Sequence, residues 1–194
     1  MTLSLHIFAK NPHVCDTKTR LKSLLNDEER KYITKDMLKM ICLSLSNLDY
    51  DKFLHVYPDY SNDFFKNLSK KYNLNLLNQS NDSLSFKIFS TLENFKDSYY
   101  KRILIGSDIP SISENEIKLC DDYLDDYDCV FGPSRDGGFY LIGVKNNNHN
   151  ILRDLELNKI ELNILKEKCR YNNLKYKLIN ELKDIDRAED LLTI

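Results

Sequence analysis

A group of basic and hydroxyl side chains lies close to the N-terminus. Lys10 comes shortly before Pro12, and the run Lys18-Thr19-Arg20 follows at an expected helix start. The first backbone N–H groups of a helix have no partner within the helix, so cations and a hydroxyl beside them favour an anion such as a phosphate. A solvated basic turn would have the same composition. On its own, this group leaves phosphate binding and a simple surface turn as open interpretations.

A carboxylate follows the clearest predicted strand, Arg102–Gly106. Ser107 and Asp108 come directly after the strand, and Pro110 fixes the turn. Mg²⁺ in proteins is usually bound by one or two carboxylates together with the phosphates of a substrate. An aspartate in this position also commonly caps the turn that follows it. The sequence therefore makes Asp108 either a cation ligand or a turn residue.

Two adjacent glycines precede another apolar strand. Asp136 is followed by Gly137 and Gly138, and the run Phe139–Gly143 is mostly apolar. Without a Cβ atom, paired glycines let backbone N–H groups approach a ligand closely. The same Asp-Gly pattern is typical of a hairpin turn between antiparallel strands. Both interpretations stay open from the residues alone.

Near the C-terminus, Asp184 and Asp186 follow the last predicted strand. We expect these two carboxylates to face opposite sides of an extended segment, so that only one of them can reach a given metal ion. From the residues alone, Asp186 is either a ligand of such an ion or the cap of a terminal helix over Arg187–Leu192.

Strand and helix patterns alternate along the chain, and each chemical group above lies near the end of a predicted strand. The predicted strands are Leu3–Phe8, Phe53–Tyr57, Leu74–Leu77, Arg102–Gly106, Asp128–Gly132, Gly138–Val144 and Tyr176–Ile179. The main predicted helices are Asp27–Leu48, Asp82–Phe95, Ser113–Leu124, Ile160–Asn172 and Arg187–Leu192. This order predicts one α/β domain over residues 1–194, with helices on both faces of a mostly parallel sheet. Ligands of such sheets bind beyond the carboxyl ends of the strands.

Composition narrows the function classes. The chain has 194 residues and a formal net charge of −2, which gives no support to a general nucleic-acid binder. At 42% hydrophobic residues, it is too apolar for a disordered chain. No apolar run approaches the ~20 residues of a membrane span. Five cysteines without a C-x-x-C pair predict free thiols and a cytoplasmic location.

Taken together and in order, these motifs resemble a known family. The chain contains Lys-x-Pro and Lys-Thr-Arg-Leu, then Gly-Ser-Asp-x-Pro, then Gly-Pro-x-x-Asp-Gly-Gly-Phe-Tyr-Leu-Ile-Gly, and finally Asp-x-Asp-x-x-x-Asp-Leu. This set resembles a bacterial family of GT-A-like glycosyltransferases, some of them of the arsenosugar-biosynthesis type. It is similar in plan to 2-phospholactate guanylyltransferase and molybdenum cofactor guanylyltransferase. All belong to the nucleotide-diphospho-sugar transferase superfamily, and the resemblance covers nearly the whole chain.

The resemblance implies a three-layer α/β/α fold and a role for each group. The nucleotide phosphates would bind Lys10, Lys18, Thr19, Arg20 and Ser107. An Mg²⁺ or Mn²⁺ ion would bind Asp108 and Asp186. The acceptor or sugar pocket would be formed by Asp136, Gly137, Gly138 and Tyr140, with Asp108 and Asp136 as the catalytic residues.

The chain departs from the family pattern at three places. Val14-Cys15 stands where the family has Pro-Gly, so the glycine of the phosphate loop is missing. The stretch Asn81–Lys87 lacks the expected Gly, Glu and Arg, and a Trp-Ser-Thr-like segment is missing near Leu157–Lys159. These departures place the largest change on the donor side of the site.

Three functions follow as hypotheses. The first is a metal-dependent glycosyltransferase that uses a nucleotide sugar and a small-molecule acceptor. The second is a nucleotidylyltransferase, which joins a nucleoside triphosphate to a phosphorylated acceptor and releases pyrophosphate. The third is a non-catalytic nucleotide-binding protein. No nucleic acid or membrane is expected as a partner, and homodimer formation is left open.

Overall fold

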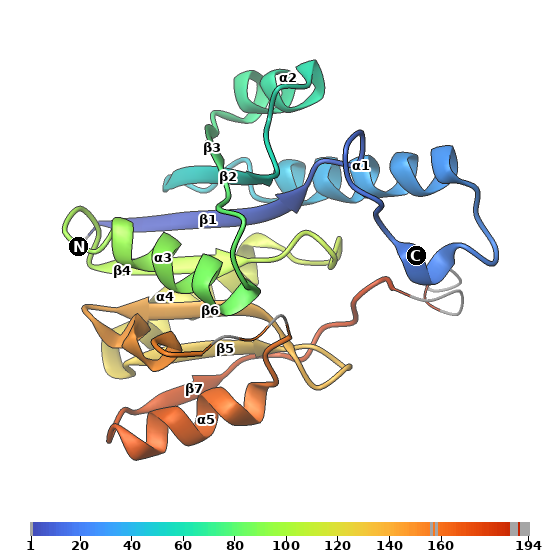
Figure 1. The fold of residues 1–194 in the computed structure, drawn as a ribbon. Helices are drawn as coiled ribbons and strands as arrows, with labels where there is room; N and C mark the ends of the chain where they lie inside the picture. The colour runs from blue at the N-terminus through green and yellow to red at the C-terminus, as the bar shows by residue number, and fades with distance from the viewer. Residues whose placement is uncertain (1, 156, 158, 187–189, 191–194) are drawn as a thin grey trace.

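One sheet of seven strands runs through the molecule (Figure 1). The computed structural model describes residues 2–155, 157, 159–186 and 190. The order of the strands in space is β3-β2-β1-β4-β6-β5-β7. Their bounds are Leu3–Lys10 (β1), Asp51–Tyr57 (β2), Asn75–Asn78 (β3), Lys101–Ile105 (β4), Cys129–Pro133 (β5), Phe139–Lys145 (β6) and Tyr176–Leu178 (β7). All pairs are parallel except those of β6, which is antiparallel to both β4 and β5, so the predicted mostly parallel sheet is confirmed.

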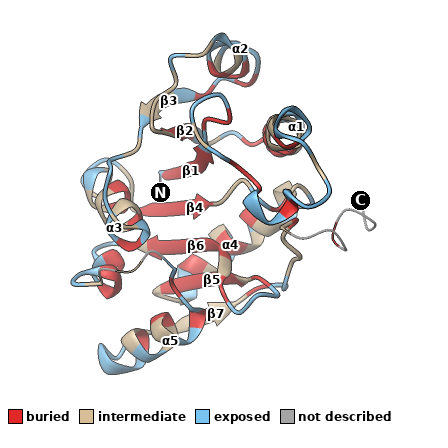
Figure 2. Ribbon diagram, turned by 45° about the vertical axis from the view of Figure 1, so that its right-hand side comes forward, coloured by how far each residue is buried: buried red, intermediate tan, exposed pale blue. Residues whose placement is uncertain are grey.

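Helices cover both faces of this sheet, which gives the predicted three layers (Figure 2). The helices are α1 (Asp27–Ser44), α2 (Asp63–Tyr72), α3 (Leu84–Asn94), α4 (Glu114–Asp126) and α5 (Leu162–Tyr171), with short 3-10 helices η1 (Thr19–Leu21) and η2 (Asn148–Leu152). One hydrophobic core packs α1, α2 and α4 on the sheet, and contains Ile41, Phe65 and Ile117. The second core packs α3 and α5 on the opposite face, through Leu92 and Leu165.

Burial on both faces explains why the central strands are nearly continuous apolar runs. Side chains along a strand alternate between its two faces. In β1, Leu5 and Ile7 point into the first core, whereas Phe8 points into the second. None of the helices in the described part of the chain is both long and apolar enough to cross a membrane.

Local sequence signals set several helix starts. Ser113 caps α4 and forms a capping box with Glu116. The Ser113 hydroxyl accepts from the backbone N–H of Glu116, and the Glu116 carboxylate accepts from the backbone N–H of Ser113. Asn26 and Glu29 form the same box at α1. Helix α1 ends at Ser44, earlier than the predicted Leu48, although Leu48 is still buried.

The segment after β7 runs along the carboxyl edge of the sheet. The backbone N–H of Leu182 donates to the carbonyl of Pro133, and that of Ile185 donates to the carbonyl of Asp108, at 3.1 and 3.0 Å. These bonds bring the C-terminal carboxylates to the end of β4. The predicted helix over Arg187–Leu192 lies almost entirely outside the described residues.

Candidate active site

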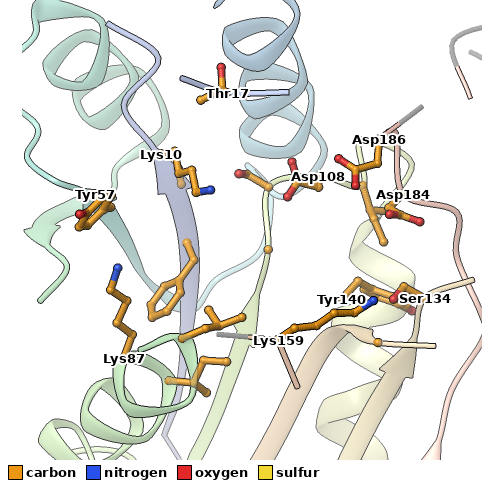
Figure 3. A pocket seen from close by; sticks show the side chains of 18 of the residues that line it. Lys10, Thr17, Tyr57, Lys87, Asp108, Ser134, Tyr140, Lys159, Asp184 and Asp186 are labelled. Carbon is orange, nitrogen blue, oxygen red and sulfur yellow. The ribbon is translucent and has the colours of Figure 1, made fainter. Parts of the chain in front are cut away.

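A cavity of about 830 Å³, lined by apolar as well as charged side chains, opens at the carboxyl ends of β1, β2 and β4 and at the start of β6 (Figure 3). Such an edge is where the topology of an open α/β sheet places ligands. The cavity is lined by nearly all of the residues predicted for the site, namely Lys10, Lys18, Thr19, Arg20, Ser107, Asp108, Asp136, Gly138, Tyr140 and Asp186. Gly137 is the exception, because it is not among the lining residues.

Lys18 is buried between the N-terminal loop and the end of β4. Its ammonium donates to Oδ1 of Asp108 at 2.5 Å and to the carbonyl of Ile185 at 2.6 Å. Removing an ammonium from water is costly unless a counter-charge and hydrogen bonds compensate for it, and both are present here. The predicted phosphate ligand Lys18 is therefore paired with the predicted metal ligand Asp108, whose side chain is still 65% exposed.

Arg20 and Asp186 form a second ion pair of the same kind. Both side chains are partly exposed, and exposed ion pairs contribute only about 0–1 kcal/mol to stability. The pair can therefore open at little cost when a ligand offers each group a stronger partner. In both pairs, a cation of the N-terminal loop neutralises a carboxylate from a distant part of the chain.

Asp184 and Asp186 both line the cavity, so the prediction that they face opposite sides is wrong. The physical reason is the two-residue period of an extended chain, which puts residues i and i+2 on the same face. Burial raises the pKa of Asp184, and the negative charges of Asp136, Asp186 and Asp190 raise it further. The cavity is thus more acidic on this side than the sequence interpretation allowed.

The Asp-Gly-Gly segment is a hairpin turn between β5 and β6, and it also contributes to the cavity. Gly137 has a φ of +85°, a backbone conformation that residues with a side chain rarely adopt. Oδ1 of Asp136 accepts from the hydroxyl of Ser134 at 2.7 Å and from the backbone N–H of Gly138 at 3.0 Å. That N–H is therefore used within the turn, contrary to the expectation that it approaches a ligand.

The contacts of Asp136 favour the ionised form of its carboxyl group. Burial acts to raise its pKa, but the bonds from Ser134 and Gly138 and the ammonium of Lys159 at 3.2 Å outweigh burial, so the pKa is lowered. Tyr140 is buried, and its hydroxyl donates to the carbonyl of Asn180 at 3.0 Å. Its aromatic ring lines the cavity, while its hydroxyl has a structural partner.

Several lining residues were missed by the sequence interpretation, above all Tyr57, Lys87 and Lys159. Tyr57 is the last residue of β2, so the rule that strand ends form the site would have found it. Lys87 lies in the first turns of α3, in the stretch that lacks the family's Arg, and supplies a cation there. Lys159 belongs to the segment that lacks the expected Trp-Ser-Thr.

The residues present suit a hard divalent cation that is completed by substrate phosphates. Asp108 and Asp186 both line the cavity, and carboxylate oxygens are the ligands that Mg²⁺ and Mn²⁺ prefer. Within the described ranges, no group of three or more His, Cys, Asp or Glu side chains encloses a metal site. Two carboxylates without a third protein ligand fit a metal that arrives with phosphates, as Mg²⁺ does in many nucleotide sites.

Sequence and structure comparisons agree with this geometry. Residues 45–159 match a family described as "Uncharacterized protein conserved in bacteria (DUF2064)". The 2-phospho-L-lactate guanylyltransferase of Methanocaldococcus vulcanius is 32% identical over 178 residues, which cover 90% of this chain and 76% of that protein.

Solved structures share the fold. A protein from Desulfovibrio desulfuricans G20, assigned as a nucleotide-diphospho-sugar transferase, superposes with a TM-score of 0.87 at 22% identity, over 98% of this chain and 85% of that one. A Mycobacterium tuberculosis H37Rv protein solved with manganese has a TM-score of 0.61 at 9% identity, over 100% of this chain and 97% of that one. These results favour the nucleotidylyltransferase hypothesis over the glycosyltransferase that the motifs had placed first. The chain belongs to the DUF2064 family and, together with its guanylyltransferase homologues, is a transferase with the nucleotide-diphospho-sugar transferase fold.

Proposed function

We propose that the protein is a metal-dependent nucleotidyltransferase that transfers a nucleoside monophosphate, with guanosine as the first candidate, to the phosphate of a small phosphorylated acid. An oxygen of the acceptor phosphate attacks the α-phosphorus of the triphosphate. The bond between the α-phosphorus and the bridging oxygen breaks, and pyrophosphate leaves with that oxygen. The observation that carries the proposal is one cavity in which loop cations meet the Asp108 carboxylate, in a chain homologous to guanylyltransferases over most of its length.

The N-terminal loop and the end of β4 would hold the triphosphate. Lys10, Thr19 and Ser107 line the cavity, and Lys18 and Arg20 could exchange their carboxylate partners for phosphate oxygens. Asp108 and Asp186, freed in the same exchange, would hold the metal ion. When bound, that ion supplies positive charge where the leaving pyrophosphate develops negative charge. Phosphoryl transfer depends mostly on such positioning and charge neutralisation, so no nucleophilic side chain is required.

The opposite side of the cavity would bind the acceptor. Asp136, Gly138 and Tyr140 form its wall, and Lys159 reaches into it beside Asp136. The ammonium of Lys159 can orient an anionic acceptor, since a phosphorylated acid brings more negative charge than Asp136 alone. We assign Asp136 to positioning, because its hydrogen bonds within the turn hold both its carboxylate and Lys159 in place.

The test is pyrophosphate release. The protein is mixed with GTP, ATP, CTP or UTP, with Mg²⁺ or Mn²⁺, and with 2-phospho-L-lactate or related phosphorylated hydroxy acids. We expect pyrophosphate release with GTP that requires both the acceptor and the metal, and that stops when EDTA removes the metal. Transfer from a nucleotide sugar, without pyrophosphate release from any triphosphate, would reject the proposal and favour the glycosyltransferase.

A further inference from the structure

We infer that the acceptor carries an apolar group larger than a methyl, and that this group binds in an apolar recess on the α3 side of the cavity. The inference rests on the proposed function, because it takes the ligand of this side to be the acceptor. It adds the chemical class of that acceptor, a phosphorylated 2-hydroxy acid with a branched aliphatic side chain. It also assigns to Gly106 the role of keeping the recess open.

The recess is formed by apolar side chains that line the cavity, most of which also belong to the second core. Strands β1, β4 and β6, helix α3 and the segment before α5 all contribute to it. Its members are Phe8, Leu84, Ile88, Leu104, Phe139 and Ile160. Figure 3 shows Lys87 and Lys159 on opposite sides of the cavity, with side chains made only of carbon between them. Phosphates and a metal ion require polar partners, so this surface suits another part of a ligand.

The recess has an exposed apolar rim and a buried apolar floor. Leu84 is 37% exposed, and Phe139 is partly buried. The other four side chains are at most 8% exposed, and their packing in the second core holds them in place. Water on such a surface is displaced favourably by a hydrocarbon group, roughly in proportion to the apolar area that becomes covered.

The absence of a side chain at Gly106 leaves the recess open. Gly106 directly follows β4, and its backbone N–H donates to the carbonyl of Tyr140 at 3.1 Å, so the pairing with β6 continues past the end of the strand. Side chains two residues apart on a strand share a face, so a Cβ at position 106 would lie on the same side as Leu104. No atom lies within 4 Å of such a Cβ, and the φ angle of Gly106 is outside the left-handed range that favours glycine. The backbone does not require a glycine here, and its effect is to provide space beside Leu104.

The recess adjoins the side of the cavity to which we assign the acceptor. Ile160 follows Lys159, whose ammonium lies 3.2 Å from the carboxylate of Asp136. Phe139 lies in the chain between Gly138 and Tyr140, which belong to the acceptor wall. An acceptor whose anionic groups bind near Lys159 therefore brings its remaining substituent to the recess. A methyl group would cover little of a surface built from six side chains, whereas an isobutyl group can contact several of them.

The first test compares acceptors that differ only in their substituent. Pyrophosphate release from GTP gives kcat/KM for 2-phospho-L-lactate and for the 2-phospho derivatives of 2-hydroxyisocaproate and malate. Their substituents are a methyl, an isobutyl and a carboxymethyl group, and the last two have equal numbers of non-hydrogen atoms. We expect the isobutyl compound to exceed the methyl compound about tenfold to a hundredfold, because each buried methylene adds several-fold. An equal or higher kcat/KM for the methyl or the carboxymethyl compound would overturn the inference.

The second test fills the recess from Gly106. Gly106→Val should reduce the preference for the isobutyl over the methyl compound to about threefold or less, and Gly106→Ala should give an intermediate preference. The control is Phe86→Ala, since Phe86 is exposed on α3 and is not among the residues that line the cavity. It should keep the full preference, and thermal unfolding checks that each variant is folded. An unchanged preference in folded Gly106→Val would overturn the inference, and so would a raised KM for GTP alone, which would place the donor's base in the recess.

Failure of this inference is distinguishable from failure of the proposed function, because binding is also measured without a reaction. Calorimetric titrations of the methyl and isobutyl compounds use the protein alone and the protein with the α,β-methylene analogue of GTP, which cannot release pyrophosphate. If no triphosphate releases pyrophosphate, but the isobutyl compound binds at least about tenfold more tightly and Gly106→Val removes the difference, the recess stands and the reaction is rejected. If pyrophosphate is released and the methyl compound is used at least as well, the reaction stands and the recess is rejected.

Discussion

At the scale of single residues, three cations of the site are paired with carboxylates before any ligand is bound. Lys18 forms an ion pair with Asp108, Arg20 with Asp186, and Lys159 with Asp136. A triphosphate with its metal would offer better partners to both members of the first two pairs. The pair with Asp108 compensates the buried charge of Lys18 in the free protein, where an unpaired charge would be costly.

The aromatic wall of the cavity depends on a glycine in β5. A Cβ atom at Gly132 would lie 2.4 Å from Cζ of Tyr140, whose ring is fixed by the bond from its hydroxyl to Asn180. We expect Gly132→Ala to lower the free energy of unfolding by about 1–3 kcal/mol through overpacking.

Gly106→Ala is the matched control, because no atom lies within 4 Å of an added Cβ at that position. Its free energy of unfolding should change by about 0.5 kcal/mol or less. Urea denaturation measures the free energy of unfolding of both variants. Equal stabilities would show that Tyr140 does not pack against Gly132 as described.

The sequence largely predicted which residues line the cavity, but it did not predict which of them form ion pairs with one another. The rule that ligands bind beyond strand ends selected Asp108 and Asp136, and it failed for Lys87 because that residue follows a short strand and a loop. The pairing of Lys18 with Asp108 joins positions 90 residues apart and depends on tertiary structure alone. The prediction that Asp184 and Asp186 face opposite sides was wrong because residues i and i+2 of an extended chain lie on the same face.

At the scale of elements, β1 and β2 carry a buried histidine pair outside the cavity. Nδ1 of His6 lies 2.9 Å from Nε2 of His55, and the hydroxyl of Ser4 lies 2.9 Å from Nε2 of His6. Burial lowers the pKa of His55 to about 4 and also lowers that of His6. The two rings are therefore neutral packing elements at neutral pH.

This pair predicts a pH-dependent stability. In the unfolded chain histidine has a pKa near 6.5, so acid protonates the unfolded state before the folded state. The free energy of unfolding that depends on these histidines is therefore highest above about pH 6.5 and falls as the pH decreases toward 4. His55 alone accounts for a loss of roughly 2 kcal/mol by pH 5.

This loss is measured by urea denaturation at pH 7.5 and at pH 5. Three proteins are compared: the unaltered protein, His55→Phe and the control His13→Gln. His13 is exposed, so His13→Gln should lose as much stability as the unaltered protein. His55→Phe, which fits the neighbouring aromatic rings of Phe8 and Phe95, should lose less. An equal loss in all three proteins would contradict the assignment.

The strands and helices themselves were mostly predictable, because the central strands are apolar on both faces and the helices carry clear start signals. All seven predicted strands are present, with ends that differ by a few residues. The antiparallel direction of β6 was not predictable from its composition, since apolar residues fill a strand of either direction. It follows instead from the short Asp-Gly-Gly turn, which cannot make a parallel crossover.

At the scale of the whole molecule, the fold brings three distant segments to one edge of the sheet. The N-terminal loop supplies the cations, the end of β4 supplies Asp108, and the segment after β7 supplies Asp184 and Asp186. Lys18 ties all three together through Asp108 and the carbonyl of Ile185. The retained fold and the homology over most of the chain support a working transferase despite the altered loop at Val14-Cys15.

Transfer of a label from the α-phosphate of GTP to the acceptor would show nucleotidyl transfer itself. The protein is incubated with GTP labelled at the α-phosphate, 2-phospho-L-lactate and Mg²⁺ or Mn²⁺, and the products are separated. Asp108→Asn is the test variant, and Asp126→Asn, an exposed substitution at the end of α4, is the control. We predict that the label moves to the acceptor with release of unlabelled pyrophosphate, that Asp126→Asn behaves in the same way, and that Asp108→Asn loses at least a hundredfold in rate. Nucleotidyl transfer is rejected if the label stays in GTP with every phosphorylated acceptor, and the role of Asp108 is rejected if Asp108→Asn transfers the label at the rate of the unaltered protein.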